Sequence, residues 1–74
     1  MPLSPDDVDN IKSFGENIRR IRIEKKWSME YLANQANIEL SQIYRIEKGK
    51  INPKLTTIIT LTKALEVSIE NLIV

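Results

Sequence analysis

The chain consists of segments whose apolar residues recur at helical spacing, separated by short polar breaks. Spacing of this kind predicts amphipathic helices. No segment shows the strict apolar and polar alternation of a half-buried strand, and no two-residue hairpin signal is present. We therefore predict an all-α fold, a compact bundle of four to five helices around one small core. The expected helices cover residues 5–26, the segment between Ser28 and Asn37, and residues 39–47, 55–65 and 69–73.

Strong start signals precede the first helix. Ser4 can accept a backbone N–H of the first turn, and Pro5 occupies the first helical position, where a missing N–H does no harm. The apolar spacing continues through Gly15, which favours one long helix. A second capping box at residues 13–16 leaves open a short leading turn followed by a helix that begins near Phe14.

Residues 28–47 are predicted to form two short helices that meet at a tight turn. Ser28 can cap the first helix, and Asn37 can close it, because asparagine adopts the left-handed backbone conformation at low cost. Ile43 and Ile46 share one side of the second helix and mark its buried face. The outward positions of the second helix are Leu40, Ser41, Gln42, Tyr44 and Arg45. These side chains combine apolar, hydrogen-bonding and cationic groups, which suits contacts to base edges in the major groove of DNA.

The same residues resemble a known motif, the helix-turn-helix of the phage-repressor and Cro-like (XRE-type) family of bacterial transcription regulators. In that family a small capping residue is followed by Leu-Ala, a glycine turn and a closing Ile-x-x-Ile-Glu-x-Gly. The corresponding positions are Ser28, Leu32-Ala33, Asn37, Ile43 and Ile46-Glu47-Lys48-Gly49. The resemblance extends from about residue 14 to residue 72. Compact Cro repressors, restriction-modification controller proteins and antitoxins all share this module.

Three positions depart from the family pattern. Met29 stands where the family often has a glutamine that touches phosphate, Asn37 replaces the glycine of the turn, and Glu39 replaces the Ser or Thr cap of the second helix. A carboxylate close to DNA repels phosphate unless it accepts from a cytosine amino group or from a helix N-terminus. Glu39 therefore bears on the detail of recognition and leaves the motif intact.

The resemblance implies a transcriptional regulator that binds specific sequences of double-stranded DNA as a homodimer. Helix 39–47 is then expected to lie in the major groove and to contact base edges through its outward side chains. Ser41, Gln42 and Arg45 are the first choices for these contacts, with Leu40 and Tyr44 beside them. The guanidinium of Arg45 suits a guanine, whose O6 and N7 accept two hydrogen bonds.

The resemblance also separates structural charges from phosphate-binding charges. The family pairs an arginine near the end of the first helix with the glutamate that ends the recognition helix, so we expect a structural salt bridge between Arg22 and Glu47. The loop after the recognition helix lies along the DNA backbone in the family, and the amides that open the next helix help to hold a phosphate. The expected phosphate contacts are Arg19, Ser28, Lys48, Lys50, Asn52, Lys54 and Thr57.

Charge is distributed unevenly, although the net charge is only +1. Residues 1–18 carry four acids against one lysine, whereas residues 19–26 and 45–54 are both strongly basic. Two basic patches fit an electrostatic footprint for DNA, although lysines and arginines on ordinary solvated helices explain them equally well. We divide the chain into an acidic N-terminal helical extension, residues 1–12, and a helix-turn-helix DNA-binding domain, residues 13–74. The acidity of the extension predicts that it points away from phosphate or touches the partner subunit.

The C-terminal end of the chain is apolar. Ile69, Leu72, Ile73 and Val74 expose a patch if the protein is monomeric. A two-fold dimer through these residues accounts for the patch, because regulators of this family contact two half-sites about one helical turn apart. Packing of the same residues into their own domain is the competing interpretation.

Composition excludes several other functions. The chain has no cysteine and no histidine, and it has no Gly-rich loop or plausible catalytic carboxylate pair, so we expect no metal, no cofactor and no enzyme. No apolar run approaches the roughly 18 residues of a membrane span, and no signal peptide is recognisable. We expect a cytoplasmic protein without a small-molecule effector domain. The alternative function is a protein-interaction module, antitoxin-like or partner-binding, with secondary DNA affinity; Met29, Glu39 and the low net charge favour it.

Overall fold

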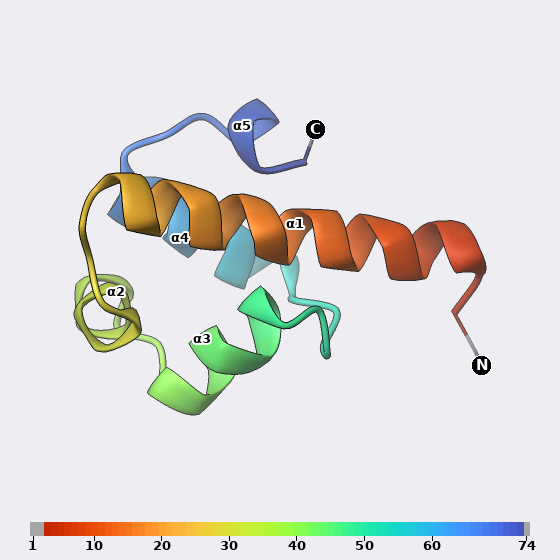
Figure 1. Cartoon of the computed structure of the whole chain (residues 1–74), viewed down its shortest axis with the longest axis horizontal. Coiled ribbons are helices and arrows are strands. Elements are labelled where there is room, and N and C mark those ends of the chain that lie inside the picture. Colours follow the sequence, from red (N-terminus) through yellow and green to blue (C-terminus); the bar gives the residue numbers. More distant parts are fainter. Residues whose placement is uncertain (1–2, 74) are drawn as a thin grey trace.

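The computed structural model describes residues 3–73, and over this range it contains helices and no strand. The prediction of an all-α fold is confirmed. The helices are α1 (Pro5–Glu24), α2 (Met29–Ala36), α3 (Leu40–Glu47), α4 (Leu55–Leu65) and α5 (Glu70–Ile73). In Figure 1, α1 runs through the middle of the molecule, with α5 on one side of it and α2 and α3 on the other. Over the described range, none of the helices combines the length and the apolarity needed to cross a bilayer.

Helix α1 is continuous, as the unbroken apolar spacing predicted, and the alternative helix beginning near Phe14 is wrong. Its start is a capping box: the Ser4 hydroxyl oxygen accepts the Asp7 N–H at 3.1 Å, and the Asp7 carboxylate accepts the Ser4 N–H at 3.4 Å. The helix passes the expected boundary between residues 12 and 13 without a break. The N-terminal end of α1 projects beyond the other helices (Figure 1), so the described part of the extension, residues 3–12, forms an arm rather than part of the core.

Left-handed residues follow four helices of the described chain. They are Lys26, Asn37, Gly49 and Glu66, with φ between 54° and 67°. After α2, the Ile38 N–H donates to the Ala33 carbonyl at 2.9 Å, and after α3 the Lys50 N–H donates to the Arg45 carbonyl at 2.9 Å. Bonds of this pattern satisfy the last carbonyls of a helix and turn the chain sharply. The expected closure of the second helix at Asn37 is therefore confirmed.

A single cluster of apolar side chains joins all five helices. Helix α1 packs against α3 and α5, and α2 packs against α3 and α4. The buried members of the cluster are Phe14, Ile18, Ile21, Leu32, Ala33, Ala36, Ile43, Ile46, Leu61, Leu65 and Leu72. Because every helix contributes at least one of these residues, the position of each helix depends on the others.

Helix α5 folds back onto the chain's own core. Leu72 is fully buried there, and the side-chain amide of Asn17 donates to the Leu72 carbonyl at 2.9 Å. The expectation that Leu72 belongs to a dimer interface is therefore wrong, because the residue closes the core of its own domain. Ile69 and Ile73 remain 42% and 61% exposed. Val74 lies outside the described residues.

Helices α1 and α3 are in close contact at Gly15. A β-carbon at this position would collide with the carbonyl oxygen of Ile46 and lie 3.0 Å from that of Glu47. Only glycine allows the backbone of α1 to come this near to the C-terminal end of α3. The contact fixes where α3 sits on the domain.

Gly15→Ala is expected to destabilise the protein by about 1–3 kcal/mol, because the added methyl group forces α1 and α3 apart. An exposed helical glycine would behave oppositely, since alanine favours the helix by about 1 kcal/mol. The free energy of unfolding, measured in urea, shows directly whether the substitution lowers or raises stability. Glu16→Ala, at the next and exposed position of α1, is the control and should change stability by less than about 0.5 kcal/mol. An unchanged or raised stability for Gly15→Ala contradicts the close contact.

Candidate nucleic-acid interface

Local hydrogen bonds build the turn between α2 and α3. The hydroxyl oxygen of Ser28 accepts the Tyr31 N–H at 3.0 Å and so caps α2. The left-handed Asn37 ends α2, and α3 begins two residues after Ile38. Glu39 precedes α3 but makes no capping hydrogen bond through its side chain, which is exposed. Its carboxylate is therefore near the start of α3 without being held by that helix.

Helix α3 has one buried face and one free face. Ile43 and Ile46 are almost fully buried, as their spacing predicted. On the opposite face Leu40 and Tyr44 are 46% and 45% exposed. Ser41 and Arg45 are also exposed, whereas Gln42 is half-buried and lies at the edge of the free face. Four of the five expected base-contact residues are thus fully presented on one surface.

A shallow depression of about 700 Å³ lies between the first turn of α2 and the free face of α3. Its lining residues are Met29, Glu30, Leu40, Ser41, Tyr44, Arg45 and Lys50. The expected base-contact residues except Gln42 are therefore gathered here. Met29 and Glu30 were not expected in this surface. Their proximity depends on how α2 crosses α3, although Met29 already stood out as a departure from the family pattern.

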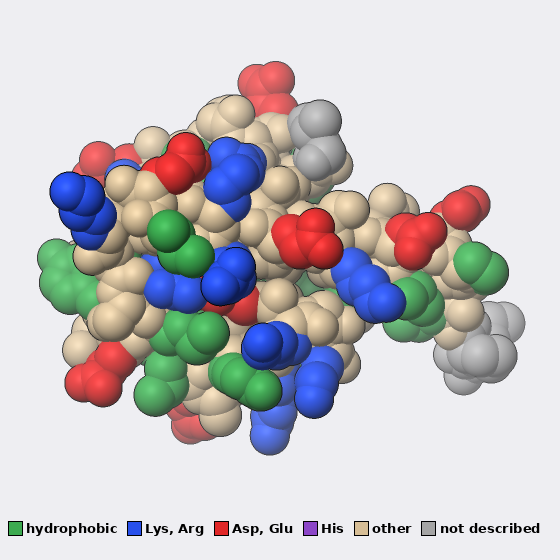
Figure 2. All heavy atoms as spheres, viewed as in Figure 1, with side chains coloured by type: hydrophobic (Ala, Val, Ile, Leu, Met, Phe, Trp, Pro, Cys, Tyr) green, Lys and Arg blue, Asp and Glu red, His purple; other side chains and the backbone are tan. Residues whose placement is uncertain are grey.

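Basic side chains accompany this surface. Figure 2 shows Lys and Arg side chains gathered near α3 and the loop that follows it, whereas acidic side chains mark the projecting end of α1. The ammonium group of Lys48 lies 5.7 Å from the centre of the Tyr44 ring, which is a cation–π distance. Lys50, Asn52 and Lys54 are exposed along the loop. The acidic arm and the basic surface thus occupy different parts of the molecule.

The other expected phosphate contacts differ in exposure and in what surrounds them. Arg19 is exposed and lies on the same side of α1 as Gly15 and Arg22, the side that faces α3. Thr57 is half-buried and lines a separate depression of about 320 Å³ beside the turn at Asn37. The Ser28 hydroxyl oxygen is already used by its own helix, but the hydroxyl hydrogen can still be donated.

A buried ion pair attaches α3 to α1. The Nε and Nη2 atoms of Arg22 donate to the two carboxylate oxygens of Glu47 at 2.7 Å and 3.0 Å. The Nη1 atom donates to the Trp27 carbonyl at 2.7 Å, so the same guanidinium also holds the chain that leads into α2. Both side chains are almost completely buried. Arg22 therefore orders three elements and is not free to bind phosphate.

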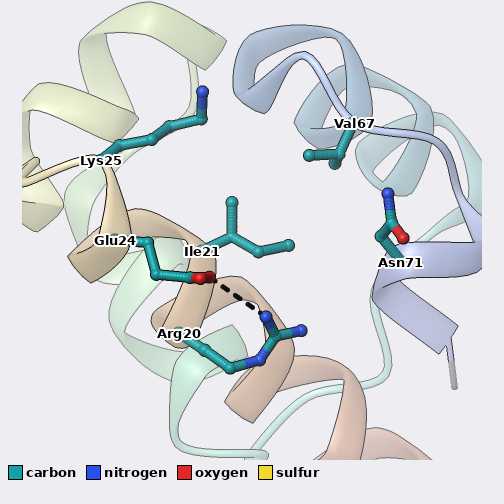
Figure 3. Close-up of a pocket in the computed structure, with 6 residues that line it drawn as sticks. All are labelled: Arg20, Ile21, Glu24, Lys25, Val67 and Asn71. Atoms are coloured by element: carbon teal, nitrogen blue, oxygen red, sulfur yellow. Dashed lines mark hydrogen bonds and ion pairs between the residues drawn. The ribbon is translucent and has the colours of Figure 1, made fainter.

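A third depression lies away from this surface, between the C-terminal part of α1 and α5 with the segment leading into it (Figure 3). It has a volume of about 350 Å³ and is lined by Arg20, Ile21, Glu24, Lys25, Val67 and Asn71. Arg20 and Glu24 point toward each other and pair at 3.1 Å, but both are exposed. Exposed pairs of this kind contribute little to stability. None of the expected DNA-contact residues lines this depression.

The chain has no histidine and no cysteine, so the carboxylates of Asp and Glu are its candidate metal ligands. Among residues 3–73, no three of these carboxylates lie close enough to share a metal ion. The surface on α3 offers hydrogen-bond donors, cations and apolar groups instead. Such groups bind a polyanion and the edges of its bases.

Comparison with known proteins assigns the family. The HTH_3 helix-turn-helix family model matches residues 18–72. The chain belongs to this family. Its members are DNA-binding transcriptional regulators and not enzymes, in agreement with the resemblance seen in the sequence. The projecting arm at the start of α1 precedes the matched residues.

Two repressors are similar in sequence to this helix-turn-helix chain. It is 40% identical over 63 residues to the HTH-type transcriptional repressor RghR of Bacillus subtilis (strain 168). The aligned residues cover 84% of this chain and 47% of the repressor. It is 32% identical over 59 residues to the immunity repressor protein of Bacillus phage phi105. The aligned residues cover 80% of this chain and 41% of that protein. The chain thus spans less than half the length of each repressor.

Solved structures show the same fold. The restriction-modification controller protein C.AhdI from Aeromonas hydrophila superposes with a TM-score of 0.83 at 30% identity, covering 86% of this chain and 97% of the controller. The hypothetical transcription factor NHTF from Neisseria superposes with a TM-score of 0.85 at 29% identity, covering 100% of this chain and 86% of that one. The arrangement of helices around α3 is therefore shared with other regulators.

Proposed function

We propose that this helix-turn-helix regulator binds specific sequences of double-stranded DNA by placing α3 in the major groove. The observation that carries the proposal is the two-faced character of α3. Its inner face is fixed to the core, while Leu40, Ser41, Tyr44 and Arg45 extend from the outer face with no part of the described chain covering them. A helix of this diameter fits the major groove, where each base pair presents a distinct set of donors and acceptors. The names of the two related repressors support repression as the outcome.

Within this proposal, Arg45 is the main sequence-reading residue. Its exposed guanidinium can donate two hydrogen bonds to O6 and N7 of a guanine. Ser41 lies four residues earlier on the same face and can donate or accept at a neighbouring base. Gln42 is half-buried, so we assign it a contact at the edge of the site rather than at its centre.

Phosphate contacts set the position of the helix. Lys48, Lys50 and Lys54 lie on the loop side of α3, and Arg19 lies on the side of α1 that faces α3. No side-chain capping hydrogen bond closes the N-terminus of α4, so its first amides and Thr57 suit a phosphate oxygen. Ser28 adds a hydroxyl donor, and Asn52 adds an amide. These groups recognise the backbone of any duplex and carry no base information.

Arg45→Ala is expected to weaken binding to a selected duplex by about 1–3 kcal/mol and to relax the preference at one base pair, because a base contact is lost. Lys54 is exposed and does not line the depression on α3, so Lys54→Ala should weaken specific and random duplexes about equally and lower the salt slope by about 1. Titration of both variants with both duplexes at several salt concentrations separates the two roles. If Arg45→Ala also weakens specific and random duplexes equally, the proposed division between base and phosphate contacts is contradicted.

We propose further that the chain acts as a homodimer. Ile73 and Ile69 leave apolar surface at α5, and Ile73 borders an apolar groove of about 160 Å³ that also includes Ile11, Phe14 and Ile58. The same groove includes Asn10 and Ile11 at the base of the projecting arm, which supports a contribution of the arm to the contact. A two-fold dimer buries this surface and presents two copies of α3.

The symmetry and spacing of the DNA sites that the protein selects test the proposed dimer. Selection of bound sites from a random duplex pool should yield inverted repeats whose half-sites are centred about 10 base pairs apart, or a multiple of that distance. The spacing follows because two α3 helices related by a two-fold axis meet the same face of the duplex. Selected sites that contain a single unrepeated element contradict the dimer, while still supporting specific DNA binding.

A further inference from the structure

We propose that the depression between α2 and α3 receives the C5-methyl group of a thymine. The inference rests on the proposed function and names the base that this part of the surface recognises. Apolar atoms, rather than hydrogen-bonding atoms, form most of the surface of the depression. Met29, Leu40 and Tyr44 are the apolar side chains of its lining.

The apolar groups are held in place by the fold. Met29 is half-buried and packs against the apolar core, so its exposed part has a fixed position in the first turn of α2. Tyr44 is on the same side of α3 as Leu40, and Lys48 lies over its ring at 5.7 Å. Nearly half of the surface of Leu40 and of Tyr44 is exposed in the free chain. A ligand that covers them with apolar atoms gains the free energy of removing this surface from water.

The rim of the depression favours the edge of a base. Arg45 and Lys50 border the depression and attract a polyanion, but Glu30 also borders it and opposes a phosphate group inside. In the major groove, thymine is the base that presents an apolar group, its C5-methyl. A guanine or cytosine edge placed against Met29 and Leu40 would leave its hydrogen-bonding groups without partners. Thymine therefore fits both the apolar lining and the charge of the rim.

Met29 acquires a function in this account. The family often has a polar glutamine at this position, and the thioether here extends the apolar surface of Leu40 across the gap between the two helices. The substitution thus exchanges a polar contact for recognition of a methyl group. It does not indicate that DNA affinity has been lost.

Deoxyuridine tests the inference, because it removes the C5-methyl of thymine and leaves every hydrogen-bonding group unchanged. Each thymine of a duplex selected from a random pool is replaced in turn, and the affinity of the full chain is measured. One thymine of each half-site should show a loss of about fourfold, the factor expected for burying one methyl group. The other thymines should show no loss.

Protein variants locate the effect in the depression. Leu40→Gln and Met29→Gln should bind the thymine and deoxyuridine duplexes equally at that position. Ile23→Gln is the matched control, because Ile23 is 48% exposed, close to the 46% of Leu40, but lies on α1 outside the depression. This control should retain the fourfold difference. Circular dichroism confirms that each variant is folded.

The outcomes separate this inference from the proposed function. If specific duplexes are selected and Arg45→Ala relaxes one base pair, but deoxyuridine is neutral at every position, methyl recognition is overturned and DNA reading by α3 stands. If the Leu40 and Met29 variants keep the fourfold difference, the methyl group is recognised elsewhere and the assignment to this depression is overturned. If no duplex is preferred over random DNA, both proposals fail.

Discussion

The buried, bidentate salt bridge between Arg22 and Glu47 holds α3 on the domain, and the position of every exposed group on α3 depends on this salt bridge. Two hydrogen bonds fix the C-terminal end of α3 to α1, and a third ties the same guanidinium to the chain entering α2. Removing one partner would leave a buried charge, which costs about 3–5 kcal/mol. A loss of that size approaches the whole stability of many small domains. Gly15 completes the attachment, because it lets the backbone of α1 touch the carbonyl end of α3.

Fixing α3 by one face and one end leaves its other face for a ligand. The surface formed there is heterogeneous. Arg45 supplies charge, Ser41 supplies a small hydrogen-bonding group, and Leu40 with Tyr44 and Met29 supplies an apolar hollow. The loop after α3 adds lysines around this surface, while the acidic arm of α1 points elsewhere (Figure 2). A net charge of only +1 is therefore compatible with a locally basic surface, because Asp6, Asp7 and Asp9 lie on the arm of α1, although Glu30 borders the depression.

Local chemistry made most of the fold predictable from the sequence. Capping at Ser4 and Ser28, closure at Asn37 and the buried pair Ile43 and Ile46 follow from interactions between near neighbours in the chain. Long-range contacts were harder to predict. Leu72 was assigned to a partner because a four-residue helix has too few positions to show which side faces the core, and the family resemblance, not the spacing, paired Arg22 with Glu47. The close contact at Gly15 and the place of Met29 in the lining of the depression depend on how separate helices pack together. The DNA contacts themselves stay predictions.

Dimethyl sulfate gives the most direct test of the central claim, that the free face of α3 lies in the major groove. The reagent methylates guanine at N7 in the major groove and adenine at N3 in the minor groove. On a duplex that the chain binds specifically, we expect guanine N7 to be protected in each half-site, while adenine N3 at the A·T base pairs of the same half-site remains reactive. Protection of adenine N3 with fully reactive guanine N7 would contradict the account.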